Sequence, residues 1–234
     1  MEHFLFKYLQ EKKHIVSLVG AGGKTTVMYQ LAEHFANLGK KALVTTTTHI
    51  FQPACNFAQS LVEVEALWQA GSYAVVGNVE AGTGKLTQLP ADVFETYSAL
   101  ADLVLIEADG AKRLPCKAPI ENEPVLLPAS DTVIAVMGLD ALHQPIKEVC
   151  FRLERVQEVL AVTSEHYLTE EDVVKLLLSE QGAFKNVGQR NYFIVLNKCD
   201  DENRLNSALK IKSLLEKEGF ALEKLWIRGE ADCE

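Results

Sequence analysis

Apolar residues along the chain form two kinds of segment, short continuous runs and longer stretches with helical spacing. The continuous runs are rich in Val, Ile, Leu and Thr, which is typical of strands buried in a parallel sheet. We predict strands in HIVSLV, KALVTTTT, DLVLIEADG, DTVIAVMG, NYFIVLNKCD and LEKLWI, and a strand, a glycine turn and a second strand in SYAVVGNVEAGTGKLTQL. Helical spacing predicts helices in residues 25–38, PADVFETYSALA, TEEDVVKLLLSE and RLNSALKIKSLLEKEGF.

Two local signals mark helix boundaries in this pattern. Gly39 is a candidate C-cap for the first helix, because glycine adopts the left-handed conformation in which many helices end. Thr169 opens the third helix, with Asp172 in the capping-box position. Strands and helices thus alternate, which predicts an α/β fold with a mostly parallel sheet and helices on both faces. We expect a single domain over residues 1–234, with an irregular, proline-bearing insertion over the site at about 111–165.

Composition and charge narrow the classes of function. Hydrophobic residues are 48% of the chain, enough for a sizeable core, and the net charge of −9 disfavours nucleic acid and anionic membranes as partners. No apolar run is long enough to span a bilayer, and charges interrupt the N-terminal MEHFLFKYLQEKKH, unlike a signal peptide. The five cysteines contain no C-x-x-C pair, so we expect no disulfide framework and a cytoplasmic protein. The sequence does not indicate the oligomeric state.

The segment GAGGKTT lies between a predicted strand and a predicted helix and resembles a phosphate-binding loop. Leu18 stands where the usual Gly-x4-Gly-Lys-Ser/Thr pattern has its first glycine, so the loop is a variant. Glycines let backbone N–H groups at a helix N-terminus approach an anion, and Lys24 and Thr25 suit the outer phosphates and Mg²⁺. The alternative is a glycine turn that only joins strand to helix. The residues expected to bind phosphate are Gly20, Ala21, Gly22, Gly23, Lys24, Thr25 and Thr26.

Acidic residues end the apolar strand LVLIEADG. In nucleotide-hydrolysing proteins a carboxylate at such a position holds Mg²⁺, commonly through water. Glu107 and Asp109 both fit this role beside Thr25, and the sequence leaves the choice between them open. Glu107 to Gly110 has the D-x-x-G spacing of the G-protein switch, with Glu for Asp, which would bring the Gly110 N–H to the γ-phosphate. With Lys24, the two acids are the candidate catalytic residues; alternatively an acid only caps a turn.

The tetrapeptide NKCD, residues 197–200, follows the apolar run YFIVL and matches the N-K-x-D pattern that reads guanine in GTPases. In that pattern Asp200 would accept from the guanine N1–H and 2-amino group, Asn197 would contact the N7/O6 edge, and the Lys198 stem would lie over the ring. Adenine lacks these donors and would leave the carboxylate unpaired, which favours GTP. The alternative is that Asp200 or Asp201 caps the helix that follows.

Four threonines end a predicted strand in TTTTHI, residues 45–50. Thr47 or Thr48 could supply a Mg²⁺ ligand, although threonine is also common in strands. His49 is interpreted as a surface residue. The segment GTGKLT, residues 82–87, resembles the phosphate loop, but it lies in a predicted hairpin without a following helix, so we assign it no phosphate.

Three basic residues, Lys112, Arg113 and Lys117, follow the acids. They could contact phosphate or an anionic partner. The interpretation we favour is a solvated loop. The phosphate loop, the strand-end acids and N-K-x-D occur in the G-protein order, so the sequence predicts a P-loop NTPase-like fold. The expected cofactors are Mg²⁺ and GTP or another nucleoside triphosphate.

The segments VGAGGKTT, LVTTTTHIF, LIEADGAKRLPCKAP, ENEP and VLNKCD together resemble the YqeC family, over roughly residues 16–200. The resemblance implies a cytoplasmic P-loop accessory protein that helps mature a selenium-dependent molybdenum hydroxylase, with that hydroxylase or its cofactor as a partner. The maturation GTPases of nickel enzymes are similar in logic, since hydrolysis gates delivery of a cofactor. Neither composition nor motif spacing indicates selenium or molybdenum.

Two other functions are compatible with the same loop. One is a small-molecule kinase in which residues 111–130 bind the acceptor. The other is a binding module in which nucleotide sets the conformation without being hydrolysed. The sequence offers no obvious glutamine to position an attacking water, so hydrolysis is not determined by the motifs.

Overall fold

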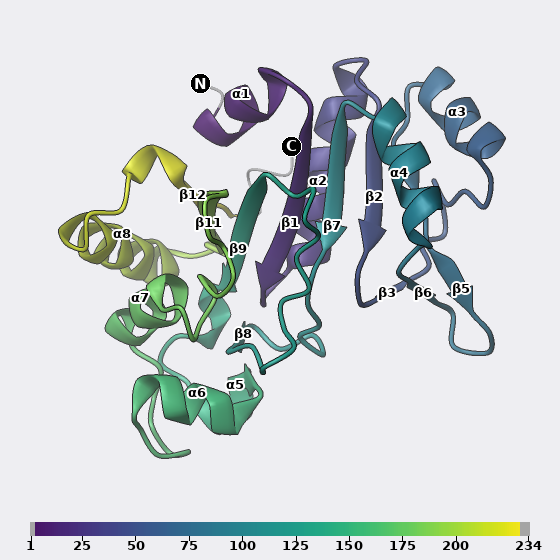
Figure 1. The fold of residues 1–234 in the computed structure, drawn as a ribbon. Helices are drawn as coiled ribbons and strands as arrows, with labels where there is room; N and C mark the ends of the chain where they lie inside the picture. Colours follow the sequence, from purple (N-terminus) through teal and green to yellow (C-terminus); the bar gives the residue numbers. More distant parts are fainter. Residues whose placement is uncertain (1–2, 230–234) are drawn as a thin grey trace.

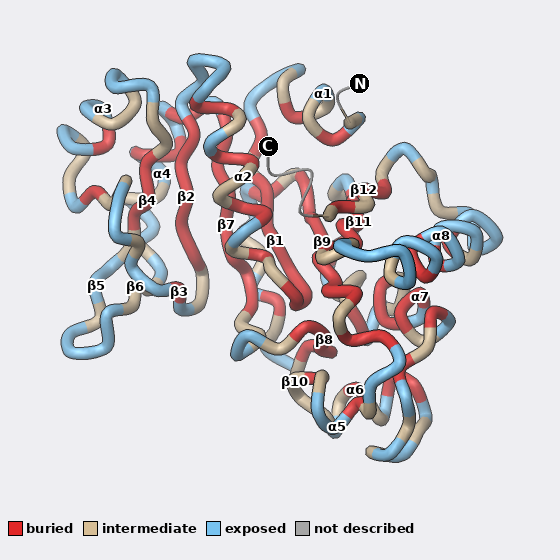
Figure 2. The backbone as a smooth tube through the Cα atoms, turned by 180° about the vertical axis from the view of Figure 1, so that it is seen from behind, coloured by how far each residue is buried: buried red, intermediate tan, exposed pale blue. Residues whose placement is uncertain are grey.

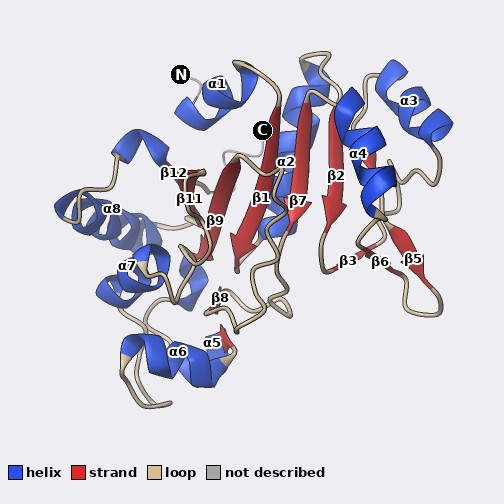
Figure 3. Ribbon diagram, viewed as in Figure 1, coloured by secondary structure: helices blue, strands red, loops and turns tan. Residues whose placement is uncertain are grey.

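A computed structural model of the protein describes residues 3–229 and has a seven-stranded sheet at its centre (Figure 1, Figure 3). The strand order is β12-β11-β9-β1-β7-β2-β4, and every neighbouring pair is parallel. The strands are β1 His14–Gly20, β2 Ala42–Thr46, β4 Ala74–Val75, β7 Leu103–Glu107, β9 Thr132–Gly138, β11 Asn191–Asn197 and β12 Leu225–Ile227. This is the parallel α/β arrangement that the sequence predicts.

The central strands are continuous apolar runs because both of their faces are covered. Every residue of β2, β7 and β9 is buried, as the colouring of Figure 2 also shows. In β9, Val133 and Ala135 pack into the core on one face of the sheet, whereas Ile134 and Val136 pack into the core on the other. The sheet therefore needs apolar residues at successive positions rather than at alternate ones.

Helices cover both faces of the sheet (Figure 1). α2 packs on one face through residues such as Val27, Leu31 and Phe35. α4 packs on the other face beside β2 and β7, and α7 and α8 pack on that face beside β9 and β11. The helices are α1 Phe4–Gln10, α2 Lys24–Asn37, α3 Leu61–Gln69, α4 Ala91–Leu100, α5 Ile146–Val149, α6 Leu153–Leu160, α7 Glu170–Leu178 and α8 Glu202–Lys217, with 3₁₀ turns η1 Leu139–Ala141 and η2 Leu222–Lys224.

The four predicted helices correspond to α2, α4, α7 and α8. Gly39 has a φ angle of 73° directly after the Leu38 C-cap of α2, in the left-handed conformation expected of it. The capping box is confirmed, since Thr169 accepts from the Asp172 N–H and the Asp172 side chain accepts from the Thr169 N–H. The pattern did not predict α1, α3, α5 or α6.

Two small sheets lie at the carboxyl edge of the large one (Figure 3). β3 His49–Phe51, β5 Asn78–Glu80 and β6 Lys85–Thr87 pair antiparallel in the order β3-β6-β5. The hairpin prediction for GTGKLT is thus confirmed, because its glycines lie in the turn between β5 and β6. β8 Cys116–Lys117 and β10 Cys150–Phe151 form the second small sheet.

The stretch 111–165, expected to be an irregular insertion, contains a central strand of the sheet. β9 lies within it, paired with β1 and β11. Residues 111–131 pass over the carboxyl ends of the strands, where Leu114 and Pro115 hydrogen-bond to Gly22 and Gly138, before returning to the start of β9. Only the two flanks of β9 lie outside the large sheet.

Within 3–229, no helix combines the length and apolar character needed to cross a membrane. Among the described residues, Cys55, Cys116 and Cys150 are free thiols. Cys233 lies outside the described residues.

Candidate functional site

The loop with the phosphate-binding motif joins β1 to α2 at the carboxyl edge of the sheet. Gly20, Gly22 and Gly23 all have positive φ angles. A Cβ atom on Gly22 would lie 2.2 Å from the Gly138 backbone nitrogen, so this position requires glycine. Gly23 is the N-cap of α2, and no side chain among residues 3–229 caps this helix. The first N–H groups of α2 are therefore suitable donors to an anion.

Three N–H groups earlier in the loop already have acceptors within the protein. The Gly20 N–H donates to the Asp109 carboxylate at 3.1 Å. The Ala21 N–H donates to a carbonyl of β9 at 2.8 Å, and the Gly22 N–H to the Leu114 carbonyl at 3.2 Å. In this conformation, the donors that an anion could use come from the first turn of α2.

The Asp109 carboxylate lies between two buried lysines. Lys24 Nζ is 3.0 Å from one of its oxygens, an ion pair without hydrogen-bond geometry, and donates to the Gly20 carbonyl at 2.6 Å. Lys117 Nζ is 3.1 Å from the other oxygen and 2.8 Å from the Glu123 carboxylate. All three ionised side chains of the Lys24–Asp109–Lys117 cluster are buried. The charge of each is therefore compensated by the other members of the cluster and not by water.

Glu107, the last residue of β7, contacts the first turn of α2. The Thr25 hydroxyl donates to Glu107 Oε2 at 2.8 Å. Burial raises the pKa of Glu107, while nearby Lys24 and the Thr25 hydrogen bond act in the opposite direction. A divalent cation beside Thr25 and Glu107 would favour the ionised carboxylate, so this pair is a chemically suitable place for one.

The threonines that follow β2 are tied to the end of β7. The Thr46 hydroxyl and the Thr47 N–H both donate to the Glu107 carbonyl, at 3.0 and 3.1 Å. The Thr47 hydroxyl donates to the Val125 carbonyl at 2.9 Å. Thr47, a predicted metal ligand, thus has its hydroxyl bound to the segment after the acids. Gly110 also lies in this region, and its carbonyl accepts from the Lys117 ammonium at 2.8 Å.

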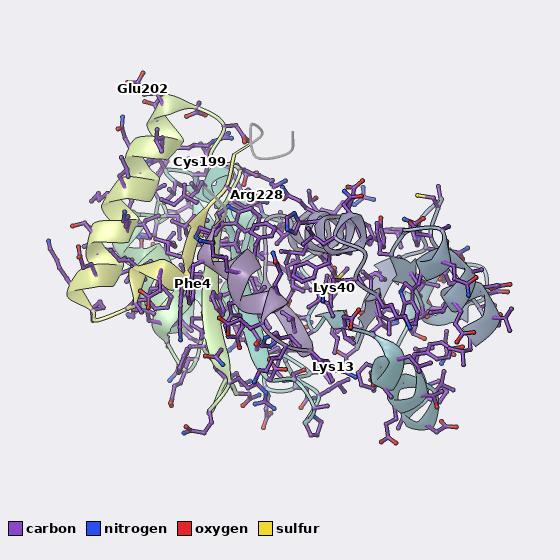
Figure 4. The ribbon with its side chains drawn as sticks, turned by 90° about the horizontal axis from the view of Figure 1, so that it is seen from above. Phe4, Lys13, Lys40, Cys199, Glu202 and Arg228 are labelled. Atoms are coloured by element: carbon purple, nitrogen blue, oxygen red, sulfur yellow. The ribbon has the colours of Figure 1, made fainter. Side chains whose placement is uncertain are left out.

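Asn197 connects the N-K-x-D segment to the glycine-rich loop before α2. It is buried, and its Nδ2 donates to the Gly22 carbonyl at 2.7 Å. Its Oδ1 accepts from Arg228 at 2.6 Å, and Arg228 also donates to Gln30 of α2. The Cys199 N–H donates to the Arg228 carbonyl, and Figure 4 shows these two residues near each other beside α8. The end of β11, the chain after β12 and the loop are therefore joined by side-chain hydrogen bonds.

The other two N-K-x-D residues lie nearer the surface. Lys198 Nζ pairs with the Asp140 carboxylate at 2.6 Å. Asp200 pairs with Arg204 at 3.4 Å. The N-cap of α8 is Asp201, whose side chain accepts from the Arg204 N–H at 2.8 Å. The sequence left open whether Asp200 or Asp201 caps this helix. The structure shows that the cap is Asp201 and not Asp200.

The sequence did not identify two residues of this site. Lys117, interpreted as part of a solvated loop, is buried and central; Lys112 and Arg113 are exposed, as that interpretation expects. The sequence feature that could have identified Lys117 as buried is its position between the apolar residues Cys116 and Ala118. Arg228 had no motif to identify it, because its contacts depend on β12 lying next to β11.

Comparisons with known proteins give a family and a distant structural similarity. A family model described as "YqeC protein" matches residues 16–154. The "Uncharacterized protein YqeC" of Escherichia coli (strain K12) is 30% identical over 237 residues, which is 93% of this chain and 88% of that protein. HypB from Helicobacter pylori, solved in complex with nickel, is 12% identical, covers 92% of each chain and gives a TM-score of 0.33. A similarity at that level supports no inference about function.

Proposed function

The chain belongs to the YqeC family, and we propose that it is a Mg²⁺-dependent nucleoside triphosphate-binding protein that prefers GTP. The observation that carries this proposal is the meeting of three groups at the N-terminus of α2. The helix begins without a side-chain cap, Lys24 lies in its first turn, and the Thr25 hydroxyl donates to the strand-end acid Glu107. Anion donors, a cation for the outer phosphates and a metal-binding pair are thus adjacent, as triphosphate binding needs.

The phosphates would be held by Lys24 and by the N–H groups from Gly23 to Thr26. Lys24 would exchange its present acceptors, the Gly20 carbonyl and Asp109, for phosphate oxygens. Lys117 would then remain beside Asp109 and keep its charge compensated. The N–H groups of residues 20–22 contribute only if the loop rearranges, because they already donate to protein acceptors.

The oxygen donors near Thr25 suit Mg²⁺, a hard cation that binds few protein ligands and retains waters. Glu107 fits the metal role better than Asp109, because two lysine ammonium groups already contact the Asp109 carboxylate. When bound, Mg²⁺ would neutralise charge on the outer phosphates. Thr25 and Glu107 would orient that ion.

We propose that the N-K-x-D segment binds the nucleobase. Asp200 would accept from guanine, and the Lys198 stem would lie over the ring. Asn197 would serve mainly to hold the loop, since both ends of its amide are already hydrogen-bonded inside the protein. Guanine preference is therefore assigned to Asp200 more than to Asn197.

The cellular role that we propose is an accessory one, in the maturation of a selenium-dependent molybdenum hydroxylase. Support for this role comes from the family resemblance alone. The proposed nucleotide binding does not require hydrolysis.

Binding of fluorescent GTP, competed by GTP, ATP and CTP with and without Mg²⁺, tests this function. We expect GTP to compete best and Mg²⁺ to strengthen binding. Lys24→Ala should abolish binding in a protein that still folds, at lower stability because buried Asp109 loses one of its two lysines. Lys12→Ala, at an exposed lysine before β1, should leave binding unchanged. If Lys24→Ala bound triphosphate as well as the parent does, the phosphate-loop assignment would be wrong.

A further inference from the structure

A cavity of about 210 Å³ lies at the carboxyl end of β2, on the face of the sheet that carries α4. Its walls include Thr45 of β2, Ala91 and Phe94 in the first turns of α4, and Leu127 and Pro128 of the segment that leads to β9. Most of the lining is apolar. An apolar cavity of about 150 Å³ is sufficient to bind benzene, so this one has room for a substituted ring.

The cavity is separate from the phosphate loop. The Glu107 side chain contacts α2 on the opposite face of the sheet. The two regions nevertheless share backbone, since Thr46 and Thr47 line the cavity and also donate to the Glu107 carbonyl. The Thr47 hydroxyl in addition anchors Val125, close to the segment that forms one cavity wall.

Polar groups are few in this cavity, and they limit the chemistry of a ligand. Thr45 is 2% exposed, and its hydroxyl has no hydrogen-bond partner in the described part of the chain. Glu95 is the charged residue of the lining, which contains no Lys, Arg or His. α4 begins beside Ala91 without a side-chain cap among the described residues, so its first N–H groups are available to a ligand oxygen.

We propose that this cavity binds a small neutral molecule with one substituted ring that carries one carbonyl or amide group. The apolar walls would cover the ring, and the polar group would reach the Thr45 hydroxyl or the first turn of α4. An anion is disfavoured, because the Glu95 carboxylate lines the cavity and no cationic side chain opposes it. This site is distinct from the proposed nucleotide site and does not depend on it.

Benzamide and benzoate are matched probes for this proposal, because they differ mainly in charge. Ligand-observed NMR on the whole protein without nucleotide should give saturable benzamide binding, with a dissociation constant on the order of 1 mM for so small a ligand. Benzoate should bind at least about tenfold more weakly. Absence of saturable benzamide binding would overturn the proposal and would leave the nucleotide assignment untouched.

Three substitutions in the cavity and one control outside it locate the binding. Ala91→Phe should obstruct the cavity and weaken benzamide binding at least about tenfold, whereas Ala66→Phe, at an exposed alanine of α3, should not. Thr45→Val removes a buried hydroxyl that has no partner in the described part of the chain, so it should raise thermal stability. The same change should weaken benzamide binding, because the hydroxyl can no longer contact the amide group. Glu95→Gln should strengthen benzoate relative to benzamide. Benzamide binding that is equal in the parent and in Ala91→Phe would place the ligand elsewhere and refute the site.

Discussion

The Asn197 side chain donates a 2.7 Å hydrogen bond to the Gly22 carbonyl, joining the end of β11 to the loop before α2. These residues are far apart in sequence and both belong to motifs associated with nucleotide binding. A Cβ atom on Gly23 would lie 2.2 Å from Asn197 Nδ2, so glycine at that position permits the contact. The shape of the loop before α2 therefore depends on a side chain of the N-K-x-D segment.

Asn197→Ala should lower the stability of the protein and weaken the binding of all nucleotides to the same extent. The variant leaves the buried Arg228 guanidinium and the Gly22 carbonyl without this partner, which costs about 1–3 kcal/mol in the free energy of unfolding. Urea denaturation measures that cost. Competition binding then compares GTP with ATP, and the expected ratio is the parental one. A selective loss of GTP would contradict this loop-holding role and assign Asn197 to the base.

The sequence predicted the strands of the large sheet well where they are long and buried on both faces. It did not predict α1, because the aromatic residues of this helix are packed by distant segments of the chain. Phe6 lies edge-on against Trp226, and Tyr8 packs on Phe193. α6 lies in the stretch expected to be irregular, where helical spacing extends over only eight residues. Short helices that depend on tertiary packing have weak local signals.

For the site, the motifs identified residues but not their pairings. The order of loop, acids and N-K-x-D predicted a P-loop NTPase-like fold, and the parallel sheet brings these segments together at its carboxyl edge. The proposed preference for Glu107 over Asp109 as a metal ligand rests on the two lysine contacts to Asp109. The choice between Asp200 and Asp201 as the α8 cap required the hydrogen bond to Arg204. Both depend on side-chain directions that spacing alone does not determine.

Lys117→Met should destabilise the fold far more than Lys112→Ala does. Lys117 compensates the charge of the buried Asp109 carboxylate and of the partly buried Glu123 carboxylate, and its removal leaves each with one partner fewer. Breaking one side of a buried ion pair costs about 3–5 kcal/mol. Lys112 is exposed and should change stability by less than about 0.5 kcal/mol. Denaturant unfolding of both variants checks this, and equal stabilities would show that Lys117 is not central to the cluster.

On acidification, Mg²⁺-dependent nucleotide binding should begin to weaken at a higher pH than it would if the metal ligand were a carboxylate with an ordinary pKa. Burial raises the pKa of Glu107, so a proton competes with the metal for its carboxylate before other acids titrate. Isothermal titration with Mg²⁺ and nucleotide across a pH series measures the effect. Glu107→Gln should lower Mg²⁺ affinity at least about tenfold and remove this pH dependence. If the profile shifted only in Asp109→Asn, the metal role would belong to Asp109.

The same pKa shift has a consequence for stability without metal. The folded protein holds the Glu107 proton more tightly than the unfolded chain does, because burial raises the folded-state pKa. This group therefore favours folding at low pH, and that contribution is lost as the pH rises through the folded-state pKa. Glu107→Gln should accordingly make the metal-free protein less sensitive to rising pH in thermal unfolding. A parallel pH dependence in the parent and the variant would show that Glu107 does not titrate in this way.

Asp200→Asn decides whether the protein reads guanine. If Asp200 accepts from the guanine N1–H and 2-amino group, the variant turns one acceptor into a donor that faces a donor. GTP affinity should then fall at least about tenfold, about 1.4 kcal/mol, and xanthosine triphosphate, which has an oxygen at the 2-position, should gain relative to GTP. The fold should tolerate the change, because the Asp200–Arg204 pair is partly exposed and contributes little.

Asp201→Asn is the matched control for that experiment. Asp201 is the N-cap of α8, and Asn caps a helix nearly as well as Asp, so neither stability nor nucleotide preference should change. Competition of GTP, ATP and xanthosine triphosphate against one fluorescent nucleotide gives the ratios for the parent and both variants. A GTP-to-xanthosine ratio that Asp200→Asn leaves unchanged would remove guanine selectivity from the proposed function, leaving a triphosphate site at α2 without a base reader at residue 200.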